Sequence, residues 1–248
     1  MPHLCKTLPP AIILAGLALL AWAGPAVAQS VTLDIQPGGG LTNRAVQLVA
    51  LISILSLAPS ILVMVTSFTR IVVVLSLLRT ALGVQQSPPN SVLISLALFL
   101  TAFIMAPVLQ QSWTDGVKPL MDEQIQLNEA FDKASKPVHG FMLKHVREKD
   151  LGLFLDISKA EKPDNPEDVS LRVLIPAFMI SELRRAFEIG FLLFIPFIVI
   201  DLVVASVLMS MGMMMLPPII ISLPFKLIFF VLVDGWHLVT GSLLKSFG

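Results

Sequence analysis

Residues 171–222 read LRVLIPAFMISELRRAFEIGFLLFIPFIVIDLVVASVLMSMGMMMLPPIIIS, and this long apolar stretch decides the fold. Pro196 interrupts it, and Pro217-Pro218 ends it in a turn, because proline has no amide hydrogen with which to continue a helix. Residues 219–244 are apolar again and form a second arm. We therefore predict that residues 173–248 form a helical hairpin with kinked apolar helices.

The composition agrees with a membrane-associated chain. Of the 248 residues, 55% are hydrophobic and 14% are charged, whereas soluble domains have about 45–50% apolar and about 25% charged residues. Lysine and arginine total 17, aspartate and glutamate also total 17, and the formal net charge is zero. A neutral chain has no excess charge with which to attract nucleic acid, so no nucleic-acid partner is expected.

The first 28 residues have the pattern of a secretory signal peptide. Lys6 supplies a positive charge, Ala11–Leu20 an apolar segment, and Ala26-Val27-Ala28 a cleavage site of small residues. An ordinary first transmembrane helix is the alternative, although the apolar run is shorter than the roughly 20 residues of a span. Residues 29–44 form a polar leader.

A first helical hairpin is predicted over residues 45–109. The apolar run from 45 to 78 would measure about 50 Å as one helix, which exceeds a hydrocarbon core of roughly 30 Å. We therefore expect a break or kink at Pro59 and a partly hydrated second helix that carries Arg70. The Ser87-Pro88-Pro89-Asn90 sequence is a turn, and the apolar arm at 92–109 follows it.

Residues 110–172 differ in composition and predict a small soluble, helical insertion. They contain twelve of the seventeen acidic residues. Helical spacing of apolar residues marks Met121–Ala134 and Val138–Asp150, and a loop with two prolines covers 162–166. The predicted fold class is therefore all-α, with two apolar hairpins and this insertion.

Eight charged residues lie within the apolar regions. A charge at the centre of a bilayer costs at least about 2.5–3.5 kcal/mol, so these side chains must face protein or water. Spacing allows local pairs of Glu182 with Arg185 and of Arg184 with Glu188, whereas the others need another helix or another subunit. The sequence leaves open pairing within one subunit, pairing between subunits, and a proton relay in a transporter that uses Asp201 and Asp234. The eight are Arg70, Glu182, Arg184, Arg185, Glu188, Asp201, Lys226 and Asp234.

Five of the eleven methionines lie within seven residues, directly before the Pro217-Pro218 turn. Methionine is flexible and polarisable, so a ring of such loops could seal a pore and still deform around a passing peptide. Filling of gaps in a core is the alternative. Contiguous methionines cannot all share one core face, which favours the seal. The seal candidates are Met211, Met213, Met214 and Met215.

The sequence contains no recognisable catalytic, cofactor-binding or metal-binding motif. Cys5, the one cysteine, lies in the predicted signal peptide, and the histidines lack the spacing of a metal site. An Asp201 and Asp234 dyad and a Ser242 and His237 pair lack the glycine-framed motifs of enzymes that use such groups. We expect no enzyme activity, no cofactor and no metal.

Several motifs in order identify a resemblance to the FliP/SctR family of type III secretion export-gate proteins. The resemblance covers essentially the whole chain after the signal peptide. These motifs are FLTAFIMAP (99–107), PAF (176–178), SELRRAFEIGF (181–191), IDLV (200–203), SVLM (206–209), GMMMLPP (212–218), LPFK (223–226) and VLVDGW (231–236).

The resemblance implies a non-enzymatic subunit of a helical, oligomeric channel. Five copies would assemble with FliR and FliQ in the flagellar basal body at the bacterial inner membrane, FlhA and FlhB would complete the export apparatus, and unfolded flagellar proteins would pass through. The resemblance also implies that Met213–Met215 form the methionine gasket, and that Phe141, Phe154 and Glu182 lie at subunit contacts. From the sequence alone, a small local core is an equal alternative for the two phenylalanines.

Overall fold

The structure is a computed structural model that describes residues 41–84, 86–158, 165–213 and 215–248. The predicted signal peptide, most of the polar leader and Met214 lie outside these residues. Every described regular element is helical, which confirms the all-α fold class. The helices are α2 (Leu41–Met64), α3 (Phe68–Ala81), α4 (Asn90–Ser112), η1 (Trp113–Val117), α5 (Lys118–Met121), α6 (Leu127–His145), α7 (Glu148–Ser158), η2 (Pro166–Asp168), α8 (Leu171–Ser210), α9 (Pro218–Leu232) and α10 (Gly235–Lys245).

The chain divides into two compact units, residues 1–51 and residues 52–248. The described part of the first unit is the beginning of α2, where Val46, Val49 and Leu51 expose their side chains. The second unit contains the remaining helices and both hydrophobic cores.

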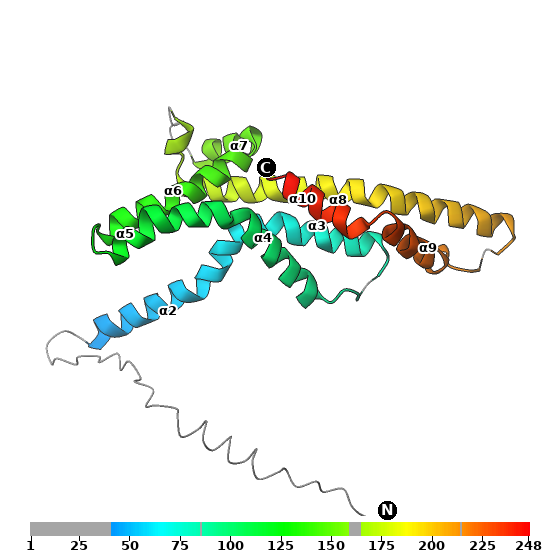
Figure 1. Cartoon of the computed structure of the whole chain (residues 1–248), viewed down its shortest axis with the longest axis horizontal. Coiled ribbons are helices and arrows are strands. Elements are labelled where there is room, and N and C mark those ends of the chain that lie inside the picture. The colour runs from blue at the N-terminus through cyan, green and yellow to red at the C-terminus, as the bar shows by residue number, and fades with distance from the viewer. Residues whose placement is uncertain (1–40, 85, 159–164, 214) are drawn as a thin grey trace, which may run out of the picture. The chain divides into compact units, whose positions relative to one another are not determined.

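The main core of the second unit forms where α3 packs along the long helix α8 (Figure 1). Ile71, Val74 and Leu78 of α3 recur every three to four residues, so they share one helix face, and all three are buried. Gly190 lets α8 approach, because a Cβ at this position would lie 2.3 Å from the Leu77 Cδ1 atom. The α3 and α8 pair is therefore the scaffold on which the other helices rest.

The break in the first apolar region lies at residues 65–67. Of the break or kink expected at Pro59, the break is therefore wrong. Helix α2 continues through Pro59 and ends at Met64, and the following helix is bent from it by 67°. Hydroxyl groups satisfy backbone atoms at the break: Thr69 Oγ1 donates to the Val63 carbonyl at 3.3 Å, and Thr66 Oγ1 accepts from the Phe68 amide at 3.4 Å. These side-chain bonds replace the helix bonds that the break removes.

The predicted turn between the arms of the first hairpin is present, and α4 begins at Asn90. Arg79 stabilises the turn by donating to Asn90 Oδ1 at 2.5 Å and to the Pro88 carbonyl at 3.3 Å. Helix α4 then continues through the π-helix η1 and through α5 as one run to Met121. The composition boundary at residue 110 therefore falls inside a helix.

In the charged insertion, two longer helices are present among the described residues, but their bounds differ from those of the two expected pieces. Helix α6 continues through Pro137, and α7 follows it. Met142 of α6 is fully buried with Leu174 and Phe178 of α8 in a second hydrophobic core. This core joins the insertion to the N-terminal half of α8.

The second hairpin has the predicted turn and one break that the sequence analysis missed. Helix α8 ends before Gly212, whose φ of +75° suits glycine, and α9 begins at Pro218. The second arm is bent by 63° between α9 and α10, where Asp234 has a φ of +50°. A Cβ on Gly235 would lie 2.2 Å from the Phe230 ring, so the ring packs directly on the glycine backbone.

Within the described residues, two helical runs are long and apolar enough to cross a membrane, namely residues 90–121 and residues 171–210. The bent pairs at 48–81 and 218–245 raise the number to four if each pair counts as one span. The described helices are therefore compatible with a membrane protein.

Candidate functional site

A buried ion pair between α3 and α8 is the centre of the polar interior. Arg70 Nε donates to Glu182 Oε2 at 2.8 Å, and Arg70 Nη2 donates to Glu182 Oε1. The side chains are 1% and 0% exposed. Such a bidentate contact fits the planar guanidinium to both carboxylate oxygens.

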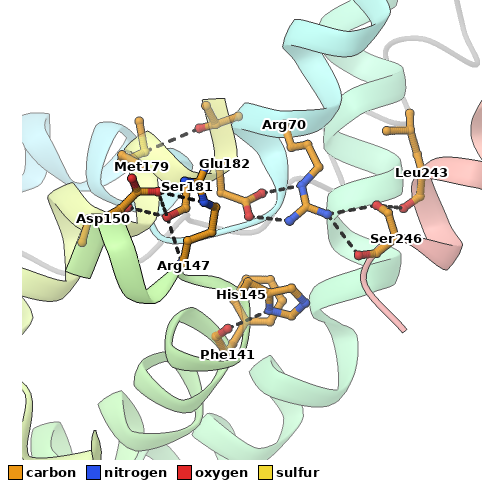
Figure 2. A network of polar contacts seen from close by, with 12 residues as sticks. Arg70, Phe141, His145, Arg147, Asp150, Met179, Ser181, Glu182, Leu243 and Ser246 are labelled. Atoms are coloured by element: carbon orange, nitrogen blue, oxygen red, sulfur yellow. Dashed lines mark hydrogen bonds and ion pairs between the residues drawn. The ribbon is translucent and has the colours of Figure 1, made fainter. Parts of the chain in front are cut away.

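The third nitrogen of Arg70 reaches the segment that follows α10. Arg70 Nη1 donates to the Ser246 carbonyl at 3.1 Å and to Ser246 Oγ at 3.0 Å. The guanidinium carbon also lies 3.6 Å from the centre of the Phe247 ring. Figure 2 shows the Arg70 guanidinium between Glu182 on one side and Ser246 on the other.

Two rings from α6 complete the surroundings of Phe247. The Phe141 ring stacks with the Phe247 ring at 6.2 Å between ring centres, and the centre of the His145 ring lies 5.3 Å from that of Phe247. His145 Nδ1 is hydrogen bonded to the Phe141 carbonyl at 2.8 Å. Burial lowers the pKa of His145, and the charge of Arg70 lowers it further. The neutral imidazole is therefore the form that this environment favours.

A second buried cation joins α9 to α8. Lys226 Nζ donates to Asp201 Oδ2 at 2.7 Å and to the Ala81 carbonyl at 3.2 Å. Ser222 Oγ donates to the other oxygen of Asp201 at 2.5 Å. The charge of Asp201 is thus balanced by a lysine on α9, and its second oxygen accepts a hydrogen bond from a hydroxyl group on the same helix.

The remaining predicted charges lie nearer the surface. Arg184 and Glu188 form the expected local pair, with Nε and Oε1 2.8 Å apart and both side chains more than half exposed. Arg185 does not pair with Glu182, which Arg70 occupies. Neither Arg185 nor Asp234 makes an ion pair with any residue that the structure describes.

A single copy of the chain therefore supplies partners for Arg70, Glu182, Asp201 and Lys226. Pairing within one subunit was one of the alternatives that the sequence left open. The presence of these four charges in apolar helices consequently does not by itself require an oligomer.

Sequence reasoning missed a third polar network, which joins α7 to α8. Ser181 Oγ donates to Asp150 Oδ2 at 2.7 Å, and the Arg147 amide donates to Ser181 Oγ at 3.0 Å. Arg147 Nε lies 3.6 Å from Asp150 Oδ2. The i, i+3 spacing of Arg147 and Asp150 was a signal, but nothing in the sequence indicated that Ser181 joins them.

The methionine segment forms the turn between α8 and α9, and its described side chains face outward. Met211 is 62% exposed, Met213 is 44% exposed and Met215 is 98% exposed. Within the described part of the turn, the core-filling interpretation therefore does not apply.

Phe141 and Phe154 do not stand free on the surface. Both are half-buried, and both pack against the second core around Met142 and Phe178. The local-core alternative therefore describes their surroundings within one chain.

The described residues contain no group of three or more histidine, cysteine, aspartate and glutamate side chains that could hold a metal ion. Asp201 is bonded to Lys226 and Ser222, and among the described contacts the His237 ring makes no hydrogen bond to Ser242.

These features define a class of protein. Long apolar helices face outward, while arginine, lysine and acidic side chains are matched in the interior, as expected of a helical membrane protein.

Comparison with known proteins identifies the family. The model of the FliP family matches residues 51–243, and the chain belongs to this family. A flagellar biosynthetic protein FliP from Caulobacter vibrioides is 66% identical over 236 residues, which cover 95% of this chain and 89% of the relative. Proteins of the same name from Bacillus subtilis and Aquifex aeolicus are 58% and 49% identical, over 83% and 92% of this chain and 93% and 97% of their own lengths.

Proposed function

We propose that the chain is a channel-forming subunit of the flagellar protein export gate in the bacterial inner membrane. Several copies, five by family resemblance, assemble with FliR and FliQ, and FlhA and FlhB belong to the same export apparatus. Unfolded flagellar proteins pass through the channel, and the subunit itself has no enzyme activity. Membership of the FliP family over most of the chain supports this function.

The exposed apolar surface supports assembly with other helices. Phe191, Val203 and Phe225 of α8 and α9 are each more than half exposed. The two helices also form an apolar groove lined by residues such as Val207 and Ile221. Apolar surfaces of this extent need lipid or other subunits to cover them.

The observation that carries the seal is the exposure of the methionine turn. Met215 at 98% is the most exposed large hydrophobic side chain among those described. Because methionine has three rotatable bonds and no branch, a ring of such turns can close on itself and reshape around a passing chain. We therefore assign Met211, Met213, Met214 and Met215 to the seal.

Replacing the four seal methionines together by alanine tests this assignment. The expected result is a clear rise in ion leakage through the assembled gate, because alanine leaves the constriction open. The control replaces Met64 and Met121, which are also exposed but lie in α2 and α5, away from the methionine segment. Unchanged conductance in the first variant, or an equal rise in the control, would contradict the seal.

Of the eight charged residues in the apolar regions, Arg185 and Asp234 have no ion-pair partner among the described residues. These two are therefore the candidates for pairing between subunits. Native mass spectrometry of the detergent-extracted protein, with and without co-expressed FliQ and FliR, tests assembly. Oligomers of the full chain are expected, and their loss in Asp234→Arg with recovery in Arg185→Glu plus Asp234→Arg would identify the pair. A protein that stays monomeric under every condition would refute the assembly.

A further inference from the structure

The segment that follows α10 occupies a pocket built by three other helices. Its Ser246 receives two hydrogen bonds from Arg70 of α3, at 3.0 and 3.1 Å. Its Phe247 ring lies under the same guanidinium at 3.6 Å and beside the Phe141 and His145 rings of α6. Glu182 of α8 completes the pocket by holding the other two nitrogens of Arg70.

Arg70 divides its hydrogen bonds between two tasks. Nε and Nη2 serve Glu182, and Nη1 serves Ser246 (Figure 2). The same cation therefore closes the α3 to α8 contact and fastens the segment after α10. If the segment left, a fully buried guanidinium nitrogen would lose both partners, which is costly unless water enters.

The helices α9 and α10, which are bent relative to each other, make separate polar contacts with the rest of the molecule. Helix α9 is held by Lys226, through Asp201 of α8 and the carbonyl of Ala81. Helix α10 has no ion pair among the described contacts and is held by buried Val239 and Leu243 and by the Arg70 contacts to Ser246. The chain between the limbs bends at Asp234, whose positive φ stops the helix.

We propose that Ser246 and Phe247 form a latch that fastens α10 to the body of the molecule, with Arg70 as its receptor. Release of the latch frees α10 at the Asp234 bend while α9 stays anchored through Lys226. The free state exposes Val239 and Leu243 and admits water to the Arg70 and Glu182 pair. This inference is independent of the proposed seal and channel.

Cysteine labelling of the full chain tests the latch in a Cys5→Ser background. Leu243→Cys reports on α10, because Leu243 is 1% exposed. Ala177→Cys reports on a buried position of α8, because Ala177 is 0% exposed. Leu238→Cys, at a position 57% exposed, sets the rate of unhindered reaction with a water-soluble maleimide. Labelling is measured in membranes, with each reporter in its own variant.

Phe247→Ala is expected to accelerate labelling at position 243 at least about tenfold and to leave labelling at position 177 unchanged, because α10 opens locally. Phe247→Trp keeps an aromatic face under the guanidinium and should retain protection, whereas Phe247→Leu keeps apolar bulk without that face and should lose part of it.

Two results would overturn the latch. The first is unchanged labelling at position 243 in Phe247→Ala, which would show that the segment does not hold α10. The second is equal acceleration at positions 243 and 177, which would show that Phe247 supports the whole interior and not one helix.

Discussion

Helix α8 carries two ion pairs a few residues apart, and they differ in almost every physical respect. Glu182 is fully buried and pairs with Arg70, which lies 112 positions away in sequence. Glu188 pairs with Arg184 on the next turn of the same helix, where the side chains are 57% and 56% exposed. Both carboxylates can be recognised in the sequence as charges within an apolar run. Their difference in solvent exposure is decided by the packing of α3 on α8, which covers Glu182 and leaves Glu188 exposed.

The difference in solvation predicts a difference in energy. An exposed pair contributes about 0–1 kcal/mol, because water screens the charges and the side chains lose entropy when they meet. Removal of one partner from a buried pair costs about 3–5 kcal/mol, because the other charge stays without compensation. Substitutions along α8 can measure this contrast directly.

The largest effect is expected for Glu182→Ala. This change leaves the Arg70 guanidinium buried beside a cavity and should lower the free energy of unfolding by about 3–5 kcal/mol. The measurement is thermal unfolding of the detergent-extracted protein, with the wild type as reference. The double variant Arg70→Met plus Glu182→Leu removes both charges and should recover part of the lost stability, although it also removes the Arg70 hydrogen bonds to Ser246. No recovery at all would contradict the desolvation argument.

Asp201→Asn should have an intermediate effect. The Asp201 side chain is 30% exposed, so water at this position can partly solvate the Lys226 ammonium group after the carboxylate charge is removed. The asparagine amide can also still bond to Ser222. We expect a loss of about 2 kcal/mol, the order of a hydrogen bond to a charged group. The same unfolding assay checks it, and a loss as large as that of Glu182→Ala would show that partial exposure of the pair has no effect.

The surroundings of the buried pair should also make stability depend on pH. The pKa of His145 in the folded protein lies below its usual value near 6.5, with burial as the main cause. The unfolded chain therefore binds a proton at His145 at a higher pH than the folded chain does. The stability that neutral His145 contributes to the folded protein is fully present above about pH 6.5 and is lost as the pH falls below this value.

Melting temperatures measured between pH 8 and pH 5 test this effect. Stability should decline on acidification below about pH 6.5, and His145→Gln should decline less, because glutamine keeps a polar group but does not titrate in this range. An equal decline in both proteins would show that other groups cause the pH dependence.

The sequence predicted those features of the fold that depend on local chemistry. Apolar runs indicated the helices, the proline pairs at 88–89 and 217–218 indicated two turns, and i, i+4 spacing indicated the pair of Arg184 with Glu188. The family motifs indicated the FliP family, which the comparisons confirmed. Each of these features depends on residues close together in the chain.

Features that depend on distant residues could not be predicted. The partners of Arg70 come from α8 and from the segment after α10, and no spacing rule connects them. The break at residues 65–67 was missed because Pro59 is the stronger local signal, while hydroxyl groups on Thr66 and Thr69 stabilise the actual break. Tertiary packing therefore decided the partners of Arg70, whereas the break depends on local hydroxyl contacts that are a weaker signal than a proline.

The smallest effect is expected for Glu188→Gln, the exposed counterpart of the first prediction. Glutamine keeps the length of the side chain and removes only its charge, so the loss should be at most about 1 kcal/mol. The effect should shrink further in high salt, because the Debye length falls from about 10 Å at 0.1 M to about 3 Å at 1 M ionic strength, which is close to the separation of the pair. Unfolding at low and high salt measures both points. A loss comparable with that of Glu182→Ala would mean that Glu188 is covered in the assembled protein, and the contrast along α8 would then belong to the single chain and not to the assembly.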